Sequence, residues 1–382
     1  NHDAAMAVID GSEILWAAHA ERYSKIKNDH YLNQQIVNEA KSYGPFDKVV
    51  YYEKPLLKKT RQLYAGQYGL AFSLSEMPSD HCKKFGIKID QYIKHHESHA
   101  ATGYYTSPFR DCVILTVDAI GEWDTISIWT ASEGQMNLKE TVRYPHSIGI
   151  LYSAFTQRVG LKPAEEEYIL MGMAAYGKPI YKDKIYREFI HSPMPFKLKH
   201  NLHIGLKDWM PEADPMNIAA SIQSVTEELL ANLWSKAASY LPPKGLMYPK
   251  HNLVFGGGVA LNCAANSKLA NLGIFDDIWI MPNPGDAGSS IGCIAAAEKK
   301  FLNWKHPFLG HNILGEYPVD KIIKELKENK MCGVANGRAE FGPRALGNRS
   351  LLADPRGPKI KDLVNQIKRR QKFRPFAPAI LE

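Results

Sequence analysis

The order strand, glycine-containing loop, helix occurs twice in succession between residues 253 and 299, and it constrains the fold more than any other feature of the chain. In sequence, the two units are the strand 253–255, the loop Gly256, Gly257 and Gly258, the helix 262–271, the strand 278–281, the loop 282–286 and the helix 287–299. Strands that alternate with helices are typical of α/β proteins, and loops after such strands often bind nucleotides. We therefore predict an α/β fold with a nucleotide cleft near these loops.

Two β-hairpins are predicted earlier in the chain, over residues 5–21 and 112–130. In the first hairpin, Asp10 and Gly11 form a short turn between two apolar strands. In the second hairpin, an apolar strand leads into an acidic loop at 118–124 and returns. Because helical sequence follows each hairpin, we predict a duplicated α/β lobe with a cleft between the two copies. Apolar residues at steps of three and four also predict a core helix over 215–241.

The overall composition is that of a globular protein with more than one core, since 45% of the 382 residues are hydrophobic and 23% are charged. No run of eighteen or more apolar residues occurs, and the chain does not begin with the basic and apolar order of a signal peptide. We expect a cytoplasmic protein with no membrane partner. The five cysteines are widely spaced and form no CxxC pair, which argues against a disulfide framework or a cysteine zinc site.

A candidate metal site begins with His95 and His99, which are four residues apart. On a helix, imidazoles at this spacing share a face and can bind one metal ion. The alternative is a polar helix surface. Asp286 is a candidate third ligand because it lies at a strand-to-helix turn, although an ordinary helix N-cap would explain it equally well.

Two loops are candidates for ligand contacts. The glycines at 256–258 would let a phosphate or an adenine approach the backbone, or they form a tight turn. The acidic loop with Asp118, Glu122, Asp124 and Thr125 could orient a metal or accept a proton from a hydroxyl, or it is a solvated hairpin loop.

An arginine-rich segment begins near residue 331. Its cationic residues include Arg338, Arg344, Arg349, Arg356, Lys368, Arg369, Arg370 and Arg374. Guanidinium groups bind oxyanions through paired hydrogen bonds, and the intervening glycines would let them converge. A nucleic-acid surface is less favoured, because Pro, Gly and Phe interrupt the basic run.

Taken together, these motifs resemble the O-carbamoyltransferases typified by the nodulation protein NodU and by the tobramycin and cephamycin carbamoyltransferases. The matching segments, in chain order, are 2–5, 21–27, 95–100, 118–125, 146–152, 171–177, 257–262, 284–286 and 337–350. Two positions depart from the family pattern, with Ile169 in place of a lysine and Gln371 in place of a glutamate. We expect acceptor or phosphate contacts near them to differ.

The resemblance implies a duplicated actin-like (ASKHA, Kae1-like) domain over residues 1–325, followed by the start of a YrdC-like α/β domain over residues 326–382. It implies that the YrdC-like domain makes carbamoyl-adenylate from carbamoyl phosphate and ATP. The Kae1-like domain would then pass the carbamoyl group to an acceptor hydroxyl. Because relatives continue beyond Glu382, the YrdC-like domain is expected to be incomplete in this chain.

The resemblance also implies roles for individual residues. His95, His99 and Asp286 would bind Fe²⁺ or Mn²⁺, and Mg²⁺ would accompany ATP. Asp118 would orient the acceptor, and we count it with His99 and Arg344 as catalytic. The expected cofactor-binding residues are Gly256, Gly257, Gly258, Asn262, Lys25, Lys27, Arg338, Arg344, Arg349 and Arg374.

The expected partner is a small molecule with a hydroxyl group, such as a sugar, an antibiotic or a hydroxymethylated nucleotide. The net charge of +7, together with Lys25 and Lys27, favours an anionic acceptor. Nucleic acid is not an expected partner, and a homodimer stays an open alternative. A Kae1-type factor for tRNA threonylcarbamoylation would lack the arginine-rich block. A non-catalytic ATP-binding protein would have no reason to combine two histidines with Asp286.

Overall fold

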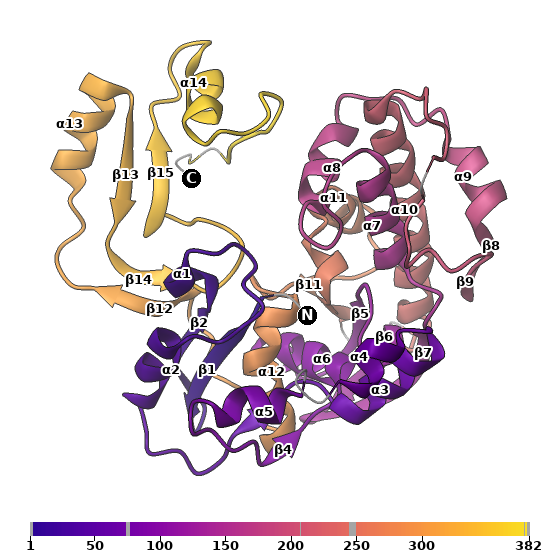
Figure 1. The fold of residues 1–382 in the computed structure, drawn as a ribbon, viewed down its shortest axis with the longest axis horizontal. Coiled ribbons are helices and arrows are strands. Elements are labelled where there is room, and N and C mark those ends of the chain that lie inside the picture. Colours follow the sequence, from indigo (N-terminus) through magenta and orange to yellow (C-terminus); the bar gives the residue numbers. More distant parts are fainter. Residues whose placement is uncertain (1–2, 74–76, 207, 244–249, 378, 380–382) are drawn as a thin grey trace.

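The computed structural model describes residues 3–73, 77–206, 208–243, 250–377 and 379. His2, in the first segment of the family pattern, lies outside the described residues. Figure 1 shows the N-terminal hairpin, a larger sheet and several helices in the lower part of the view, a group of helices at the upper right and the C-terminal elements at the upper left. Among the described residues, no helix is both long and apolar enough to cross a membrane.

The first predicted hairpin is confirmed: β1 (Ala5–Asp10) and β2 (Glu13–His19) pair antiparallel. The buried ring of Trp16 and the side chains of Ile36 and Val37 form a small core beneath it. The elements that follow are α1 (Glu21–Ser24), α2 (Gln34–Lys41), β3 (Val50–Tyr51), α3 (Pro55–Tyr64), α4 (Tyr68–Phe72), α5 (Pro78–Lys83), β4 (Gln91–Tyr92) and α6 (His95–Thr106).

The second predicted hairpin is also confirmed and belongs to a larger sheet with the strand order β11-β10-β5-β6-β7. Its strands are β5 (Cys112–Val117), β6 (Asp124–Ser132), β7 (Gln135–Arg143), β10 (Asn252–Gly256) and β11 (Asp277–Trp279). Strand β10 runs parallel to β5 and β11, whereas β5, β6 and β7 are antiparallel. The two hairpins therefore lie in separate sheets, and duplication of a whole lobe stays a prediction.

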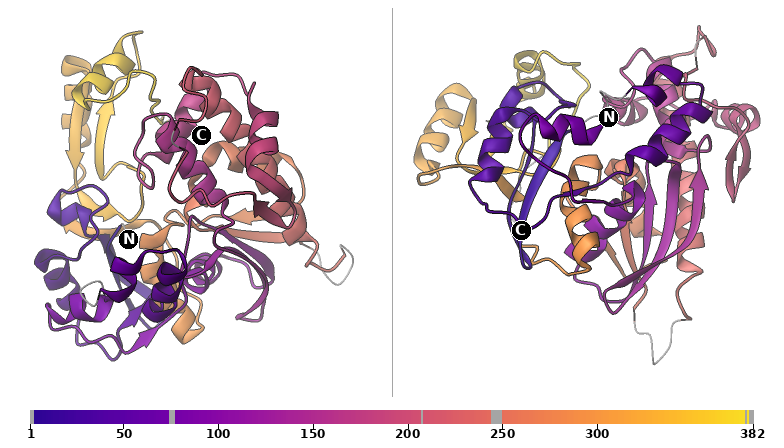
Figure 2. Two further views of the ribbon diagram at one scale, coloured as in Figure 1. Left: turned by 45° about the vertical axis from the view of Figure 1, so that its right-hand side comes forward. Right: turned by 60° about the horizontal axis from the view of Figure 1, so that its bottom comes forward.

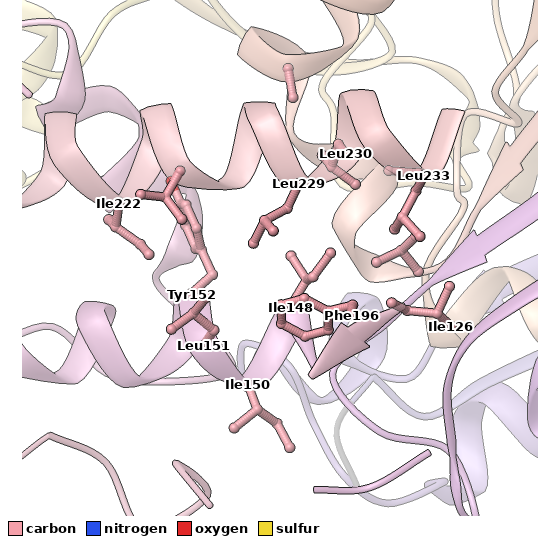
Figure 3. Packing of buried hydrophobic residues seen from close by; sticks show 14 of the residues in the cluster. Ile126, Ile148, Ile150, Leu151, Tyr152, Phe196, Ile222, Leu229, Leu230 and Leu233 are labelled. Carbon is pink, nitrogen blue, oxygen red and sulfur yellow. The ribbon is translucent and has the colours of Figure 1, made fainter. Parts of the chain in front are cut away.

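The helical group at the upper right of Figure 1 packs around α10. It comprises α7 (Ile148–Arg158), α8 (Glu167–Ala174), α9 (Lys182–Phe189), β8 (Ile190–Pro193), β9 (Phe196–Leu198), α10 (Pro215–Ala238) and α11 (Cys263–Asn271). The predicted core helix is thus confirmed. Asp214 caps it by accepting a hydrogen bond from the Met216 N–H. Figure 3 shows its apolar residues, among them Ile222 and Leu229, above Ile148 and Leu151 of α7.

Helix α12 (Ser289–Glu298) packs closely against α6, because glycine leaves room for the facing helix. A Cβ at Gly292 would lie 2.0 Å from Thr102 Oγ1 and 2.1 Å from the carbonyl oxygen of Ser98. The predicted helix 287–299 begins instead with a short 3₁₀ turn, η2 (Asp286–Gly288), and a second such turn, η1 (Gly258–Leu261), follows β10. This packing brings the start of α12 beside the start of α6.

The C-terminal elements are β12 (Phe308–Ile313), α13 (Val319–Asn329), β13 (Met331–Ala335), β14 (Gly337–Glu340), β15 (Arg349–Ala353) and α14 (Ile360–Ile367). Strand β12 pairs with β14, and β13 pairs with β15, both antiparallel. Strand β12 also lies against β2 (Figures 1 and 2). Backbone hydrogen bonds between β12 and β14 therefore join the two sides of the predicted boundary at residue 326. That boundary and the YrdC-like assignment stay predictions.

Candidate active site

The two histidines of the HxxxH pattern lie on the first turns of α6, on one face of the helix. The Nε2 atoms of His95 and His99 are 3.0 Å apart, and both side chains are buried. The expectation that the two imidazoles converge is therefore met. The Nδ1 atom of His99 lies 3.2 Å from Ser289 Oγ on α12, a contact that fixes the ring from behind.

Two carboxylates complete a cluster around these nitrogens. Asp118 Oδ2 lies 2.8 Å from His95 Nε2 and 3.2 Å from His99 Nε2, while Asp286 Oδ1 lies 3.4 Å from each. Asp118 follows β5, and Asp286 lies in η2. Ligand atoms of all four residues are within 4.8 Å of one another.

This donor set fits a divalent transition metal. Metal bonds of about 2.0–2.2 Å in a tetrahedral site place neighbouring donor atoms about 3.4 Å apart. The separations between the imidazole nitrogens and the carboxylate oxygens are 2.8–3.4 Å. Two neutral imidazoles and two carboxylates suit iron, manganese or zinc.

The two carboxylates favour the protonated form of the buried histidines. Burial by itself would lower the pKa of His99, but hydrogen bonds to Asp118 and Asp286 outweigh it and raise this pKa to about 10. The pKa of His95 is raised for the same reasons, with burial opposing the nearby Asp286 and Asp118. Burial would raise the pKa of Asp118, yet the hydrogen bonds from the two histidines hold it well below its usual range. The carboxylates therefore attract positive charge to this buried position.

Asp118 lies within the histidine and carboxylate cluster, which differs from the role that we expected for it. We expected it to orient the acceptor outside the metal ligands, but Oδ2 lies within the cluster. Its Oδ1 accepts hydrogen bonds from the backbone N–H groups of Ala119, at 2.8 Å, and Gly258, at 3.3 Å. The sequence placed Asp118 in an acidic loop that could orient a metal, but we did not count it among the expected ligands. Its position directly after the buried strand β5, beside the parallel strand β10, is the signal that could have suggested it.

The glycine loop that follows β10 contacts Asp118 and Val117 at the end of β5. Gly257 has φ +86°, and a Cβ there would lie 2.3 Å from the carbonyl oxygen of Val117, so only glycine fits. Its N–H donates to the Pro284 carbonyl, which links this loop to the Asp286 turn. Asn262 caps α11 and exchanges hydrogen bonds with Gln223. The adenylate contacts of Gly256, Gly257, Gly258 and Asn262 stay predictions.

A cavity of about 1740 Å³ reaches the cluster. His95, Asp118 and Asp286 line it at one place, while His99 lies behind them. Helix α3 contributes Lys58 and Arg61 to the wall. A small molecule in this cavity would therefore reach the cluster at three of its four residues.

Two arginines of the arginine-rich segment form hydrogen bonds within the fold. The Arg349 guanidinium donates to the backbone carbonyls of His311, Asn336, Gly337 and Asn348. Arg338 donates to the Tyr43 hydroxyl. Arg344 is exposed, and within the described chain it forms no hydrogen bond or ion pair through its side chain. Of these three arginines, Arg344 is therefore the one whose guanidinium donors are all available to a ligand.

A second, basic hollow of about 620 Å³ lies around Tyr168. Its lining residues are Lys27, Glu166, Tyr168, Lys368, Arg369, Arg370, Gln371 and Arg374. Lys27 Nζ donates to the Tyr168 hydroxyl at 2.9 Å, and Arg374 lies over the Tyr168 ring. Burial by itself would raise the pKa of Tyr168, but Lys27 and Arg374 outweigh it and lower this pKa. Two predicted cofactor-binding residues are thus brought together here, whereas Lys25 donates to the Arg22 carbonyl and lines neither hollow.

An α/β protein with a buried histidine and carboxylate cluster at the wall of a large cavity has the architecture of an enzyme. Its sequence matches the model of the carbamoyltransferase N-terminus over residues 46–296 and that of the carbamoyltransferase C-terminus over residues 323–382. The chain belongs to the carbamoyltransferase family of enzymes.

The chain is also similar to individual proteins. An uncharacterized protein of Synechocystis is 32% identical, in an alignment that covers all of this chain and 74% of that protein. Nodulation protein NolNO of Sinorhizobium fredii is 26% identical over all of this chain and 62% of its own length. Component A of (R)-2-hydroxyglutaryl-CoA dehydratase from Acidaminococcus fermentans is a structural neighbour with 12% identity and a TM-score of 0.44. That comparison covers 78% of this chain and 95% of the neighbour. We infer nothing further from so low a structural similarity.

Proposed function

We propose that this protein transfers a carbamoyl group from carbamoyl phosphate, through carbamoyl-adenylate made with ATP, to a hydroxyl group of a small molecule. The observation that carries the proposal is the convergence of His95, His99, Asp118 and Asp286 at the wall of the cavity. Membership of the carbamoyltransferase family supports the transferred group. The actin-like duplicated domain and the YrdC-like domain are part of the same proposal.

We assign a divalent metal, Fe²⁺ or Mn²⁺, to the four-residue cluster. When bound, the metal would polarise the phosphate of carbamoyl-adenylate and stabilise negative charge on the departing AMP. His95 and His99 would act as neutral ligands, and Ser289 would hold the ring of His99 in place. Asp118 would be the second carboxylate ligand beside Asp286, through its Oδ2, while the loop amides hold its Oδ1.

In the transfer step, the acceptor oxygen would attack the carbamoyl carbon, and the bond from that carbon to the adenylate oxygen would break. The leaving electron pair goes to AMP, and the proton of the hydroxyl goes to a base. Asp118 is a weaker candidate for this base than its sequence position indicated. Both of its oxygens already have partners within the fold.

The basic hollow around Tyr168 and the exposed Arg344 are the parts that we assign to oxyanions of ATP and carbamoyl phosphate. Lys27 and Arg374 both line the hollow and come from segments far apart in the sequence. Guanidinium and ammonium donors around one space are suited to phosphate. Mg²⁺ would accompany ATP.

The acceptor stays the least determined part of the proposal. We favoured an anionic acceptor, including a nucleotide, partly because of Lys25 and Lys27. Neither residue lines the cavity at the cluster, so that part of the reasoning is not supported. The net charge of +7 is then the remaining argument for an anionic acceptor. Comparable turnover of a hydroxymethylated nucleotide and of its dephosphorylated nucleoside would argue against an anionic acceptor.

The direct test is a reaction of the complete enzyme with carbamoyl phosphate, ATP, Mg²⁺ and a panel of sugars, antibiotics and hydroxymethylated nucleotides. Mass spectrometry should find one acceptor that gains a carbamoyl group, with stoichiometric AMP, pyrophosphate and inorganic phosphate. Omission of ATP or of carbamoyl phosphate should abolish the product. A carbamoylated product that forms at the same rate without ATP would overturn the proposed route.

A further inference from the structure

The loop between β5 and β6, residues 118–123, contacts both the imidazole and the backbone of His95. Asp118 lies 2.8 Å from the imidazole, and Glu122 binds the backbone. The Glu122 side chain is buried, and its two oxygens accept hydrogen bonds from the His95 N–H at 3.0 Å and 3.2 Å. Gly121 lies flat against the same residue, since a Cβ there would be 3.0–3.1 Å from three side-chain atoms of His95.

Glu122 also binds helix α3, which forms part of the cavity wall. Its Oε1 accepts a hydrogen bond from the Lys54 N–H at 2.8 Å, directly before Pro55 begins the helix. The carbonyl oxygen of Glu122 accepts a hydrogen bond from Arg61 Nε at 3.2 Å. One buried residue therefore holds the start of the wall helix and the start of the ligand helix α6.

We propose that Glu122 is a positioning residue that fixes His95 in the geometry required by the cluster and aligns the cavity wall with it. The N–H groups in the first turn of a helix lack partners within the helix. A carboxylate that accepts such N–H groups forms strong, charge-assisted hydrogen bonds and interacts favourably with the helix dipole. Glu122 is not itself among the ligand atoms of the cluster.

The geometry of the two bonds defines how Glu122 acts. Its Oε1 is the acceptor common to Lys54 and His95. A glutamine can place its carbonyl oxygen at the same position, whereas an aspartate is one methylene too short. If hydrogen bonding to the two N–H groups is what matters, Glu122→Gln should keep most of the function, and Glu122→Asp should lose it despite retaining the charge.

Hydrogen exchange on metal-free protein tests the positioning itself. The His95 and Lys54 amides should exchange about tenfold faster in Glu122→Ala and Glu122→Asp, because their acceptor is lost. In Glu122→Gln both should stay close to the rate of the unsubstituted protein. Asp214→Ala is the matched control, because it removes the carboxylate cap of α10. It should leave both amides unchanged.

Binding of Mn²⁺ to the same metal-free variants tests the consequence, which rests on the proposed metal site. Loss of a group that orients a ligand typically weakens metal affinity by about tenfold to a hundredfold. We expect that loss in Glu122→Ala and Glu122→Asp but not in Glu122→Gln or Asp214→Ala. In the complete enzyme, KM for the acceptor should rise in the same two variants, because α3 is no longer aligned.

The outcomes separate the two proposals. If the unsubstituted protein binds no Mn²⁺, the metal site is wrong, and exchange at His95 and Lys54 still decides the role of Glu122. If Glu122→Ala does not fold, the comparison of Glu122→Asp with Glu122→Gln decides it. Unchanged exchange at the His95 and Lys54 amides in Glu122→Asp would overturn the positioning role. So would a Mn²⁺ affinity of Glu122→Asp equal to that of Asp214→Ala.

Discussion

Asp118 Oδ2 lies 2.8 Å from His95 Nε2, although 23 residues separate the two in the sequence. Asp118 lies directly after the end of β5, and His95 is the first residue of α6. The end of the strand and the start of the helix therefore bring the two side chains together. Both side chains are buried. Each therefore depends on the other, or on a shared cation, to offset the loss of water.

His99→Ala should abolish binding of Mn²⁺ or Fe²⁺ and the transfer of the carbamoyl group. The substitution removes a nitrogen that lies within 3.4 Å of both cluster carboxylates. Elemental analysis and a Mn²⁺ titration measure occupancy, and His200→Ala, at an exposed histidine, is the control. Full occupancy in His99→Ala would show that His99 is not a metal ligand.

Metal affinity should increase with pH between about 6.5 and 10, because a cation must displace protons from the cluster.

The stability of the metal-free protein should instead decrease as pH rises over this range. Since the folded-state pKa of His99 is raised from 6.5 to about 10, its stabilising contribution is complete below pH 6.5 and disappears as pH approaches 10. Denaturation in a chelator at several pH values measures this loss. His99→Gln should flatten the dependence, and an unchanged slope would contradict the assignment.

Gly257→Ala should destabilise the fold by more than about 3 kcal/mol, since a positive φ and a clash with the Val117 carbonyl act together. Gly273→Ala is a matched control, because it has a positive φ but open space around the new Cβ. That substitution should cost only about 1 kcal/mol. Urea denaturation gives both values, and equal losses would mean that the close approach at Gly257 has no energetic consequence.

Arg344→Ala should impair formation of carbamoyl-adenylate in the complete enzyme without affecting stability, because its side chain is exposed. Loss of one charge-assisted contact costs about 1.5–3 kcal/mol, which corresponds to about tenfold to a hundredfold in rate. Transfer from synthetic carbamoyl-adenylate should survive, whereas His99→Ala should show the reverse. Pyrophosphate and product are measured in parallel. Loss of both steps in both folded variants would mean that one site performs all the chemistry.

Local patterns were sufficient to predict several elements. The turn at Asp10 and Gly11 and the apolar spacing in α10 depend on neighbours in the sequence, so both predictions are confirmed. The HxxxH spacing likewise determines that His95 and His99 share a face, because helix geometry alone sets it. The end of α10 at Ala238 and the 3₁₀ turn before α12 were missed, since packing and capping at helix ends decide such details.

Tertiary structure decided which residues complete the cluster and which charges are available. Asp118 could be predicted as an acidic residue of a hairpin loop, but its place among the ligands follows from the pairing of β5 with β10 and the packing of α6 on α12. The sequence pattern treated Arg344 and Arg349 alike, whereas folding turns Arg349 onto backbone carbonyls and leaves Arg344 exposed. Sequence spacing determines which side chains share one helix face. The distance between side chains on different elements depends on how those elements pack, and no local pattern contains that information.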